Sequence, residues 1–292
     1  MSRGILFYAH NNRHIDYGKI ALANSCLIKK HMKNNSVTIV TDEGTVNWLY
    51  KAYSKEFVDS KIDNIMVERR RNTPNKKRFF DTRYAKQVET FYNIDRFNSF
   101  NYSPYDETLI LDVDYMICNN QFDMCWELDY DIQINRNSKD IFSARSFEEF
   151  SRIGEQSVNF YWATAVFFRK TKEAEMLFDM VNHVQQNYEY YKLLYNFDSP
   201  TFRNDFAFSI AIHLLNGMAN NNFVKPLPVP FLQHSHGFDD FIDVEGTKFK
   251  FLLEKPNNPG DYLVCQTQDT NIHVMNKFAL NRLSDKIIKE NS

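Results

Sequence analysis

Short apolar runs alternate with amphipathic segments along the first part of the chain. Four runs have the length and composition of buried strands and lie at residues 4–9, 37–40, 65–67 and 108–111. Apolar positions at helical spacing predict helices between them, from Asp16 onwards, at 46–53 and at 80–92, with Tyr84 and Val88 inward. The alternation predicts an α/β fold with a mixed, mostly parallel sheet flanked by helices.

The second part of the chain is less regular. Strands are predicted at 141–144, 160–168, 249–253 and 271–275, and helices at 173–194 and 202–215. A Pro-rich passage at 225–230 is extended and leads to His234-Ser235-His236-Gly237. Since no flexible linker interrupts the pattern, we expect one compact domain over residues 1–292.

Composition and charge narrow the class of protein. With 43% hydrophobic and 15% aromatic residues, the chain can build a large core. A net charge of -2 gives no general signal for a nucleic-acid or membrane partner. The basic run from Arg69 to Arg78 has two readings, a solvated loop or a basic rim for an anionic donor or acceptor.

The cysteines and the hydropathy of the chain indicate the cellular compartment in which the protein is expected. The four cysteines (Cys26, Cys118, Cys125 and Cys265) show no CxxC spacing, which favours free thiols in a reducing compartment. No apolar stretch of a signal peptide follows Met1, and no apolar run approaches the ~18 residues of a membrane span. We therefore expect a soluble, cytoplasmic protein without a membrane span.

The strand at 108–111 leads directly into Asp112-Val113-Asp114. Alternate residues of an extended chain point to the same side, so one carboxylate can bind a metal while the other binds it directly, through water, or binds a ribose hydroxyl. Oxygen ligands of this kind suit Mg²⁺ or Mn²⁺ rather than Zn²⁺. The alternative is a pair of turn-forming aspartates that cap a helix.

Polar residues follow three of the predicted parallel strands. They are Tyr8-Ala9-His10-Asn11, Thr41-Asp42 and the Asp112-Val113-Asp114 segment. Ligands of open α/β sheets bind beyond the carboxyl ends of the strands. The fold rule and the acidic pair therefore indicate a site at the same edge of the sheet.

A histidine and a lysine stand four residues apart near the C-terminus, at His273 and Lys277. A histidine can complete the coordination of Mn²⁺, and a lysine can neutralise a diphosphate as a point charge. An isolated histidine would more often be structural, but together with Asp112 and Asp114 it indicates a metal site.

The strand-borne Asp-x-Asp and the late histidine resemble the GT-A glycosyltransferases, in particular family 8, the glycogenin and galactosyltransferase-like kind. The resemblance implies that Asp112, Asp114 and His273 bind Mn²⁺ (or Mg²⁺), with Asp112 and Lys277 contacting the donor, a nucleotide sugar such as a UDP-sugar. It also implies a nucleotide-sugar-binding half over 1–118. Residues 119–292 would bind the acceptor and supply the C-terminal metal and phosphate segment. The family has Gly three residues after the histidine and often Lys-Pro-Trp, where this chain has Asn276 and Lys277-Phe278.

The same resemblance suggests further donor contacts. Tyr8, Ala9 and Asn11 correspond to the segment that cradles the nucleoside, although Tyr8 also fits a core position. Arg83 and Lys86 would share a face of the predicted 80–92 helix and contact donor sugar or phosphate, or serve as plain surface cations.

On the acceptor side, the resemblance points to Trp162, Thr164, Asn204 and Asp205. By spacing alone His234 and His236 could chelate a metal, but no Cys or carboxylate cluster lies close to them in the sequence, so we expect a loop near the site with His236 as an acceptor contact. Trp162 lies beside small residues, so a sugar ring can stack on it. Asp205 is the candidate general base of an inverting reaction, whereas family-8 retention would make it a positioning residue. It also fits a first-turn or capping carboxylate of the 202–215 helix.

The sequence therefore predicts an enzyme that moves a sugar from a nucleotide sugar to an acceptor. Its partners are the nucleotide-sugar donor and an acceptor, which could be a glycan, a lipid-linked sugar, a protein or a nucleic-acid base. The basic run keeps a nucleic-acid acceptor open but does not favour it. The alternatives are a haloacid-dehalogenase-like phosphohydrolase, since its Asp-x-Asp also follows a strand, and a non-catalytic glycan-binding module.

Overall fold

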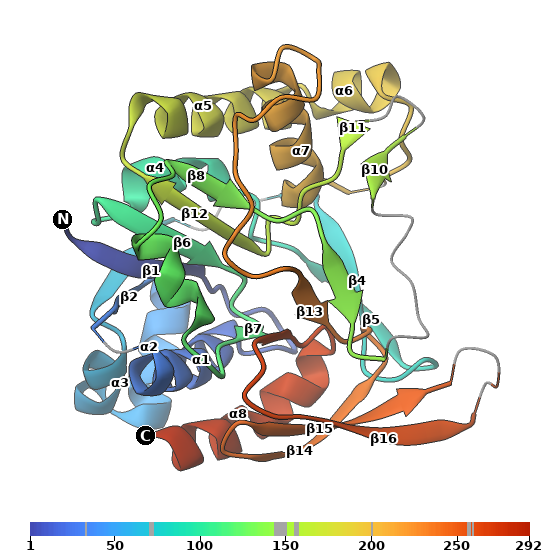
Figure 1. Ribbon diagram of the computed structural model, residues 1–292. Coiled ribbons are helices and arrows are strands. Elements are labelled where there is room, and N and C mark those ends of the chain that lie inside the picture. Colours follow the sequence, from blue (N-terminus) through green and yellow to red (C-terminus); the bar gives the residue numbers. More distant parts are fainter. Residues whose placement is uncertain are drawn as a thin grey trace.

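Six strands form the central sheet in the computed structural model, which describes residues 1–32, 34–69, 73–142, 151–154, 158–199, 201–255, 258 and 260–292. Their order is β3-β2-β1-β6-β12-β8 (Figure 1). The strands are β1 (Arg3–Tyr8), β2 (Ser36–Thr41), β3 (Asn64–Val67), β6 (Glu107–Leu111), β8 (Ile132–Ile134) and β12 (Ala165–Arg169).

The pairing is parallel from β3 to β6, and β12 runs antiparallel to both β6 and β8. Strands β1, β2 and β6 are buried almost throughout, as expected where helices cover both faces of a sheet. The predicted α/β class with a mostly parallel, helix-flanked sheet is therefore confirmed.

Helices cover the two faces of this sheet. In Figure 1 α1 (Tyr17–His31), α2 (Glu43–Tyr53) and α3 (Lys55–Lys61) lie below it, and α5 (Lys172–Gln186) and α7 (Asn204–Leu215) lie above. The remaining helical segments are η1 (Arg96–Asn98), α4 (Ser99–Tyr102), η2 (Gln121–Trp126), α6 (Tyr188–Leu194) and α8 (Lys277–Asn291). Helix α8 packs against α1, so the last and the first helix of the chain lie side by side.

A second, four-stranded sheet continues from the end of β6. It has the order β7-β17-β13-β9 and consists of β7 (Tyr115–Met116), β9 (Ser138–Asp140), β13 (Leu232–His234) and β17 (Ile272–His273). Because β7 begins just after Asp114, this sheet brings the late part of the chain to the carboxyl end of the central sheet.

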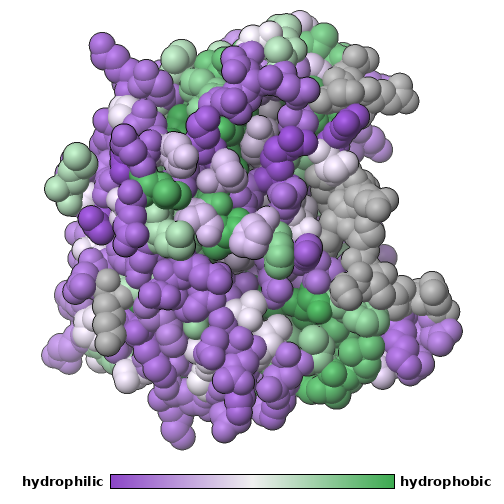
Figure 2. Space-filling view, in the orientation of Figure 1, coloured by the Kyte–Doolittle hydropathy of each residue, from purple (hydrophilic) through white to green (hydrophobic). Residues whose placement is uncertain are grey.

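Smaller sheets complete the fold. They are the pair β4 (Lys76–Phe80) and β5 (Lys86–Thr90), the pair β10 (Arg152–Ile153) and β11 (Val158–Asn159), and the three strands β14 (Asp240–Glu245), β15 (Lys248–Glu254) and β16 (Tyr262–Thr267). Figure 2 shows a mainly hydrophilic face, with apolar atoms gathered at its lower right, in the region of β15 and β16.

The predicted helix at 80–92 is wrong, because this segment forms the β4–β5 hairpin. The hydroxyl of Thr82 accepts hydrogen bonds from the backbone N–H groups of Tyr84 and Ala85, and this local turn reverses the chain. Tyr84 and Val88, expected inward, are 80% and 59% exposed. Arg83 lies in the turn and Lys86 opens β5, so the two share no helix face.

Other predicted boundaries also shift. The helix at 173–194 is two helices, because the side chain of Asn187 donates to the carbonyl of His183 where α5 ends. Of the strand predicted at 160–168, only residues 165–168 form a strand, as part of β12, and β11 ends just before the predicted range. Of the strand predicted at 141–144, residues 143 and 144 lie outside the described residues, and β9 ends just before it.

Among the helices of the described residues, none combines the length and the apolar character needed to cross a membrane. Cys26, Cys118 and Cys125 are buried free thiols, and Cys265 is a half-buried one. In the basic run, Lys76, Lys77 and Arg78 belong to β4, while residues 70–72 lie outside the described part.

Candidate active site

The two aspartates occupy the loop between β6 and β7. The backbone N–H of Asp112 donates to the carbonyl of Thr164 at 2.7 Å, and Tyr115 N–H closes the turn onto the Asp112 carbonyl at 2.9 Å. The side chain of Asn24 on α1 donates to the carbonyls of Val113 and Tyr115 at 3.2 and 2.7 Å. Three elements thus hold the loop, and the aspartates are not helix caps.

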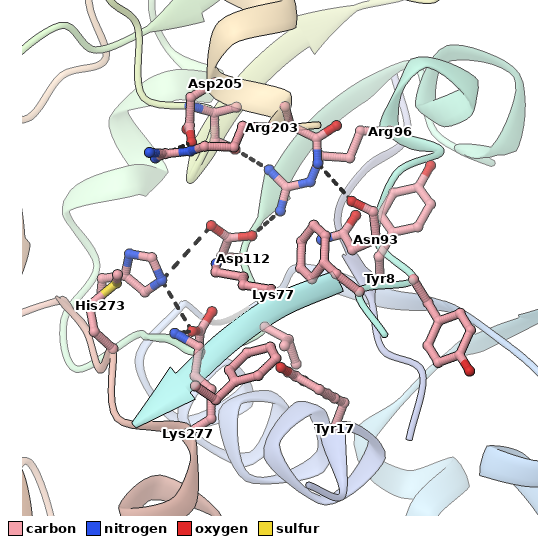
Figure 3. A pocket seen from close by; sticks show the side chains of 18 of the residues that line it. Tyr8, Tyr17, Lys77, Asn93, Arg96, Asp112, Arg203, Asp205, His273 and Lys277 are labelled. Carbon is pink, nitrogen blue, oxygen red and sulfur yellow. Dashed lines mark hydrogen bonds and ion pairs between the residues drawn. The ribbon is translucent and has the colours of Figure 1, made fainter. Parts of the chain in front are cut away.

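His273 reaches this loop through strand pairing. It lies opposite Tyr115 in the β7–β17 pair, and Val274 N–H donates to the carbonyl of Asp114 at 2.9 Å. Its Nε2 lies 3.1 Å from Asp114 Oδ2 and 3.9 Å from Asp112 Oδ2. Figure 3 marks the contact between His273 and Asp112 with a dashed line.

The donor set fits a divalent cation. One ligand atom from each of Asp112, Asp114 and His273 lies within 4.8 Å of the others, close enough to surround one ion. Two carboxylates and one imidazole suit Mn²⁺, and the oxygens alone also suit Mg²⁺. The three residues that the sequence analysis grouped as metal ligands therefore lie together in the structure.

Two cations contact the carboxylates directly. The ammonium of Lys277, the first residue of α8, contacts Asp114, and the guanidinium of Arg96 contacts Asp112. Burial alone would raise the pKa of the Asp114 carboxyl, but the charges and hydrogen bonds of Lys277 and His273 hold it below its usual value. Asp114 is therefore ionised and ready to bind a cation.

Arg96 was not predicted from the sequence. It begins η1, is 1% exposed, and also donates to the carbonyl of Ala163. Its guanidinium thus ties Asp112 to the segment before β12. No motif surrounds Arg96 in the sequence, and only the spatial meeting with Asp112 identifies it.

A cavity of about 260 Å³ opens in front of the carboxylates. Figure 3 shows side chains from β1, α1, β4, β17 and α7 pointing into it. Its lining includes Tyr8, His10, Tyr17, Lys77, Phe91, Asn93, Arg96, Asp112, Asp114, Trp162, Arg203, Asn204, Asp205, His234, His273 and Lys277.

Lys77 is a cation of this cavity without an acidic partner among the described residues. Its Nζ lies 5.1 Å from the centroid of the Phe91 ring. Lys77 keeps access to solvent, yet protein surrounds it on most sides. This crowding, with the positive charges of Lys277 and Arg203, lowers the pKa of Lys77 to about 8.

The β1 end supplies the opposite wall. Tyr8 is buried and lines the cavity, and its hydroxyl shares a hydrogen bond of 2.9 Å with Ser99. His10 also lines the cavity, with Nε2 3.2 Å from Glu68, while its buried Nδ1 has no hydrogen-bond partner within the described residues. Ala9 and Asn11 lie outside the lining, where Asn11 accepts a hydrogen bond from Gly18.

Only some of the residues predicted to bind the acceptor or the transferred sugar line the cavity. Trp162, Asn204 and Asp205 line the cavity, but Thr164 is buried behind it. His236 lies outside the lining, with its Nε2 3.0 Å from Asp140.

Asp205 accepts hydrogen bonds from Ala163 N–H and the Arg203 guanidinium, each at 2.9 Å. Arg203 was not predicted. Asp205 lies in the first turn of α7, and the N-cap residue of that helix, Arg203, makes no capping hydrogen bond with its side chain to the described residues.

Arg83 and Lys86 also lie outside the cavity lining. Arg83 pairs with Glu254 at 2.8 Å and lies over the ring of Phe238. The cations that do line the cavity are Lys77, Arg96, Arg203 and Lys277. Of the three that were not predicted as site residues, only Lys77 carried a signal, because it belongs to the basic run.

No protein-family model matches the chain, and no curated protein matches it by sequence. Solved structures similar to it include glycosyltransferase GlyE of Streptococcus pneumoniae TIGR4, with 12% identity, a TM-score of 0.44, and 78% of this chain covered. The match spans 45% of GlyE, less than half its length.

Galactosyltransferase LgtC, solved with donor and acceptor sugar analogs, is 14% identical with a TM-score of 0.44, over 72% of this chain and 70% of its own. Mouse xyloside xylosyltransferase 1 is 13% identical with a TM-score of 0.43, over 74% and 83%. All three are glycosyltransferases by name. At such low identities, substrate and chemistry have to be argued from the residues of the site.

Proposed function

We propose that the protein is a metal-dependent glycosyltransferase that moves a sugar from a nucleotide sugar, a UDP-sugar, to an acceptor. The observation that carries the proposal is the meeting of Asp112, Asp114 and His273 at the carboxyl end of the sheet, in a cavity lined by four cations. Such a site suits a ligand that is both metal-bound and anionic, as a nucleoside diphosphate is.

The cations have separate tasks in this proposal. When bound, Mn²⁺ or Mg²⁺ supplies Lewis-acid stabilisation of the diphosphate that leaves as the glycosidic bond breaks. The ammonium groups of Lys77 and Lys277 lie next to the phosphates in this proposal and neutralise part of their negative charge. Arg96 keeps Asp112 in place, because its guanidinium also contacts the carbonyl of Ala163.

His10 is the proposed contact to the nucleobase. His10 Nε2 faces the Glu68 carboxylate at 3.2 Å, and the tautomer with its proton on Nε2 has Nδ1 as an acceptor. An acceptor there fits the N3–H group of uracil. The buried Nδ1 without a partner among the described residues supports this assignment, since such atoms normally have one.

Asn204 and Asp205 are proposed to position the transferred sugar. Asn204 donates to the carbonyl of Asn93 at 2.8 Å, and its buried Oδ1 has no partner in the described part of the chain. Both oxygens of Asp205 already accept hydrogen bonds, so Asp205 fits a positioning role better than that of a general base. This favours a retaining reaction.

Thermal unfolding with nucleotides and metal tests the proposal. We expect UDP to raise the melting temperature only with Mn²⁺ or Mg²⁺ present, and Asp112→Asn and Asp114→Asn to abolish the effect. UDP-sugar consumption should fall about 100-fold or more in both variants. Phosphate release from simple phosphoesters, or sugar binding indifferent to metal and nucleotide, would instead indicate the phosphohydrolase or the glycan-binding module. A cytoplasmic location and a single catalytic domain over residues 1–292 stay predictions.

A further inference from the structure

A second histidine lies directly behind the proposed metal ligand. His234, the last residue of β13, is paired in register with His273 of β17. Paired residues of neighbouring strands project to the same face, so the two rings lie side by side, with centroids 5.1 Å apart. Their Nδ1 atoms are 3.1 Å apart, and His234 is 1% exposed.

The geometry restricts the protons of this pair. At 3.1 Å, one Nδ1 has to donate and the other has to accept, since two N–H groups or two lone pairs would repel. The Nε2 of His273 faces Asp114 and Asp112, so this atom would bind the cation. A neutral histidine that binds a cation through Nε2 carries its proton on Nδ1.

We propose that His234 is a positioning residue for the metal site: its Nδ1 accepts the Nδ1–H of His273, which fixes the tautomer and ring orientation that aim His273 Nε2 at the cation. The inference rests on the proposed function, because it requires that Asp112, Asp114 and His273 bind a divalent cation. Metal-bound histidines usually donate to a carboxylate, a carbonyl or water. A neutral histidine supplies the same acceptor without adding negative charge.

The packing around His234 favours this role, because the ring is buried and held against its neighbours. The ring of Trp162 lies 4.6 Å from that of His234 and blocks one side of it. Trp162 is itself held, since its backbone N–H donates to the carbonyl of Asn135 at 2.9 Å.

Two substitutions of His234 distinguish the effect of losing the hydrogen-bond acceptor from the effect of losing the volume of the ring. His234→Asn keeps an oxygen acceptor near the position of Nδ1, whereas His234→Leu fills similar space without one. We expect His234→Leu to weaken Mn²⁺ binding about 10- to 100-fold, measured by electron paramagnetic resonance of free Mn²⁺, and His234→Asn to retain most of the affinity. His213→Leu is the matched control, because His213 is a half-buried histidine of α7 that packs edge-to-face against Tyr195.

A second measurement needs no variant. Nitrogen-15 NMR of the histidine-labelled parent protein with Cd²⁺, a diamagnetic probe, reports which nitrogen of His273 carries the proton. We expect the proton on Nδ1 and the metal on Nε2. A His273 without a proton on Nδ1 overturns the inference, even if His234→Leu does not fold.

The outcomes separate the two proposals. If the parent binds Mn²⁺ with UDP and His234→Leu binds it equally well, only the role of His234 is overturned. If the parent binds neither Mn²⁺ nor UDP, the proposed function is wrong and the positioning role is wrong with it.

Discussion

The ammonium of Lys277 contacts the same Asp114 oxygen that lies 3.1 Å from His273 Nε2. A divalent cation at this oxygen would repel the ammonium at short range. Metal binding should therefore move Lys277 off Asp114, towards the phosphates of a donor. Lys277 should therefore weaken the binding of the metal and strengthen the binding of the nucleotide.

Substitution of Lys277 by Gln should accordingly change two affinities in opposite directions. We expect Mn²⁺ alone to bind about tenfold more tightly, and UDP in the presence of Mn²⁺ about tenfold more weakly, the effect of one charge-assisted hydrogen bond. Titration calorimetry measures both. Lys286→Gln is the control, because Lys286 lies on the same helix and pairs with Asp243 away from the site. Affinities that move together would contradict the exchange.

Lys77 should make nucleotide binding sensitive to pH. With its pKa lowered to about 8, the ammonium is charged below that pH and neutral above it. We expect the affinity for UDP with Mg²⁺ to be constant below about pH 8 and to fall by up to about tenfold per pH unit above it. In the free protein the same shift opposes folding below about pH 8, and this cost to the free energy of unfolding disappears as the pH rises towards the ordinary lysine value.

The matched variant for this titration is Lys77→Arg. Arginine stays charged over the whole range, so its UDP affinity should lose most of the pH dependence. Parallel profiles of the parent and Lys77→Arg would show that another group causes the decline.

Asp205 offers a test of positioning against base catalysis. Asp205→Asn keeps an acceptor for Ala163 N–H but loses the charge that holds Arg203. We expect kcat to fall about 10- to 100-fold with an unchanged shape of the pH–rate profile, because the reacting groups are misplaced. Loss of the acidic limb of that profile, where the rate rises as a base loses its proton, would instead identify Asp205 as the general base.

Gly4 should be intolerant of a side chain. A methyl group there would overlap the ring of Tyr105, whose hydroxyl is held by Thr38 at 2.7 Å and Asn64 at 3.3 Å. We expect Gly4→Ala to lower the free energy of unfolding by about 1–3 kcal/mol in urea denaturation. In a Tyr105→Ala background the cost should be much smaller, whereas an equal cost in both backgrounds would place the clash elsewhere.

The central sheet and the metal-ligand group were predictable because their signals are local. The apolar runs of β1, β2 and β6 are long and free of charge, and parallel strands place their carboxyl ends together. His273 was linked to Asp112 and Asp114 by resemblance, and the register of β17 against β7 supplies the physical reason.

The hairpin and the cavity cations were harder to predict. In the β4–β5 segment the aromatic spacing imitates a helix, and the decisive feature is the Thr82 hydroxyl, which bonds to the backbone of a turn. Arg96 reaches the cavity from a segment that carries no motif of its own. Its role depends on a tertiary contact with Asp112, which spacing along the chain cannot indicate. Arg203 directly precedes the predicted Asn204 and Asp205, and its contact with Asp205 is local.

His273 lies 159 positions after Asp114, in a strand that immediately precedes α8. During synthesis on the ribosome, β6 and its two aspartates emerge long before this histidine leaves the exit tunnel. A nascent chain therefore holds an incomplete ligand set until translation has passed β17. Capture of metal and nucleotide should therefore follow the synthesis of β17, well after the sheet that carries the aspartates has been made.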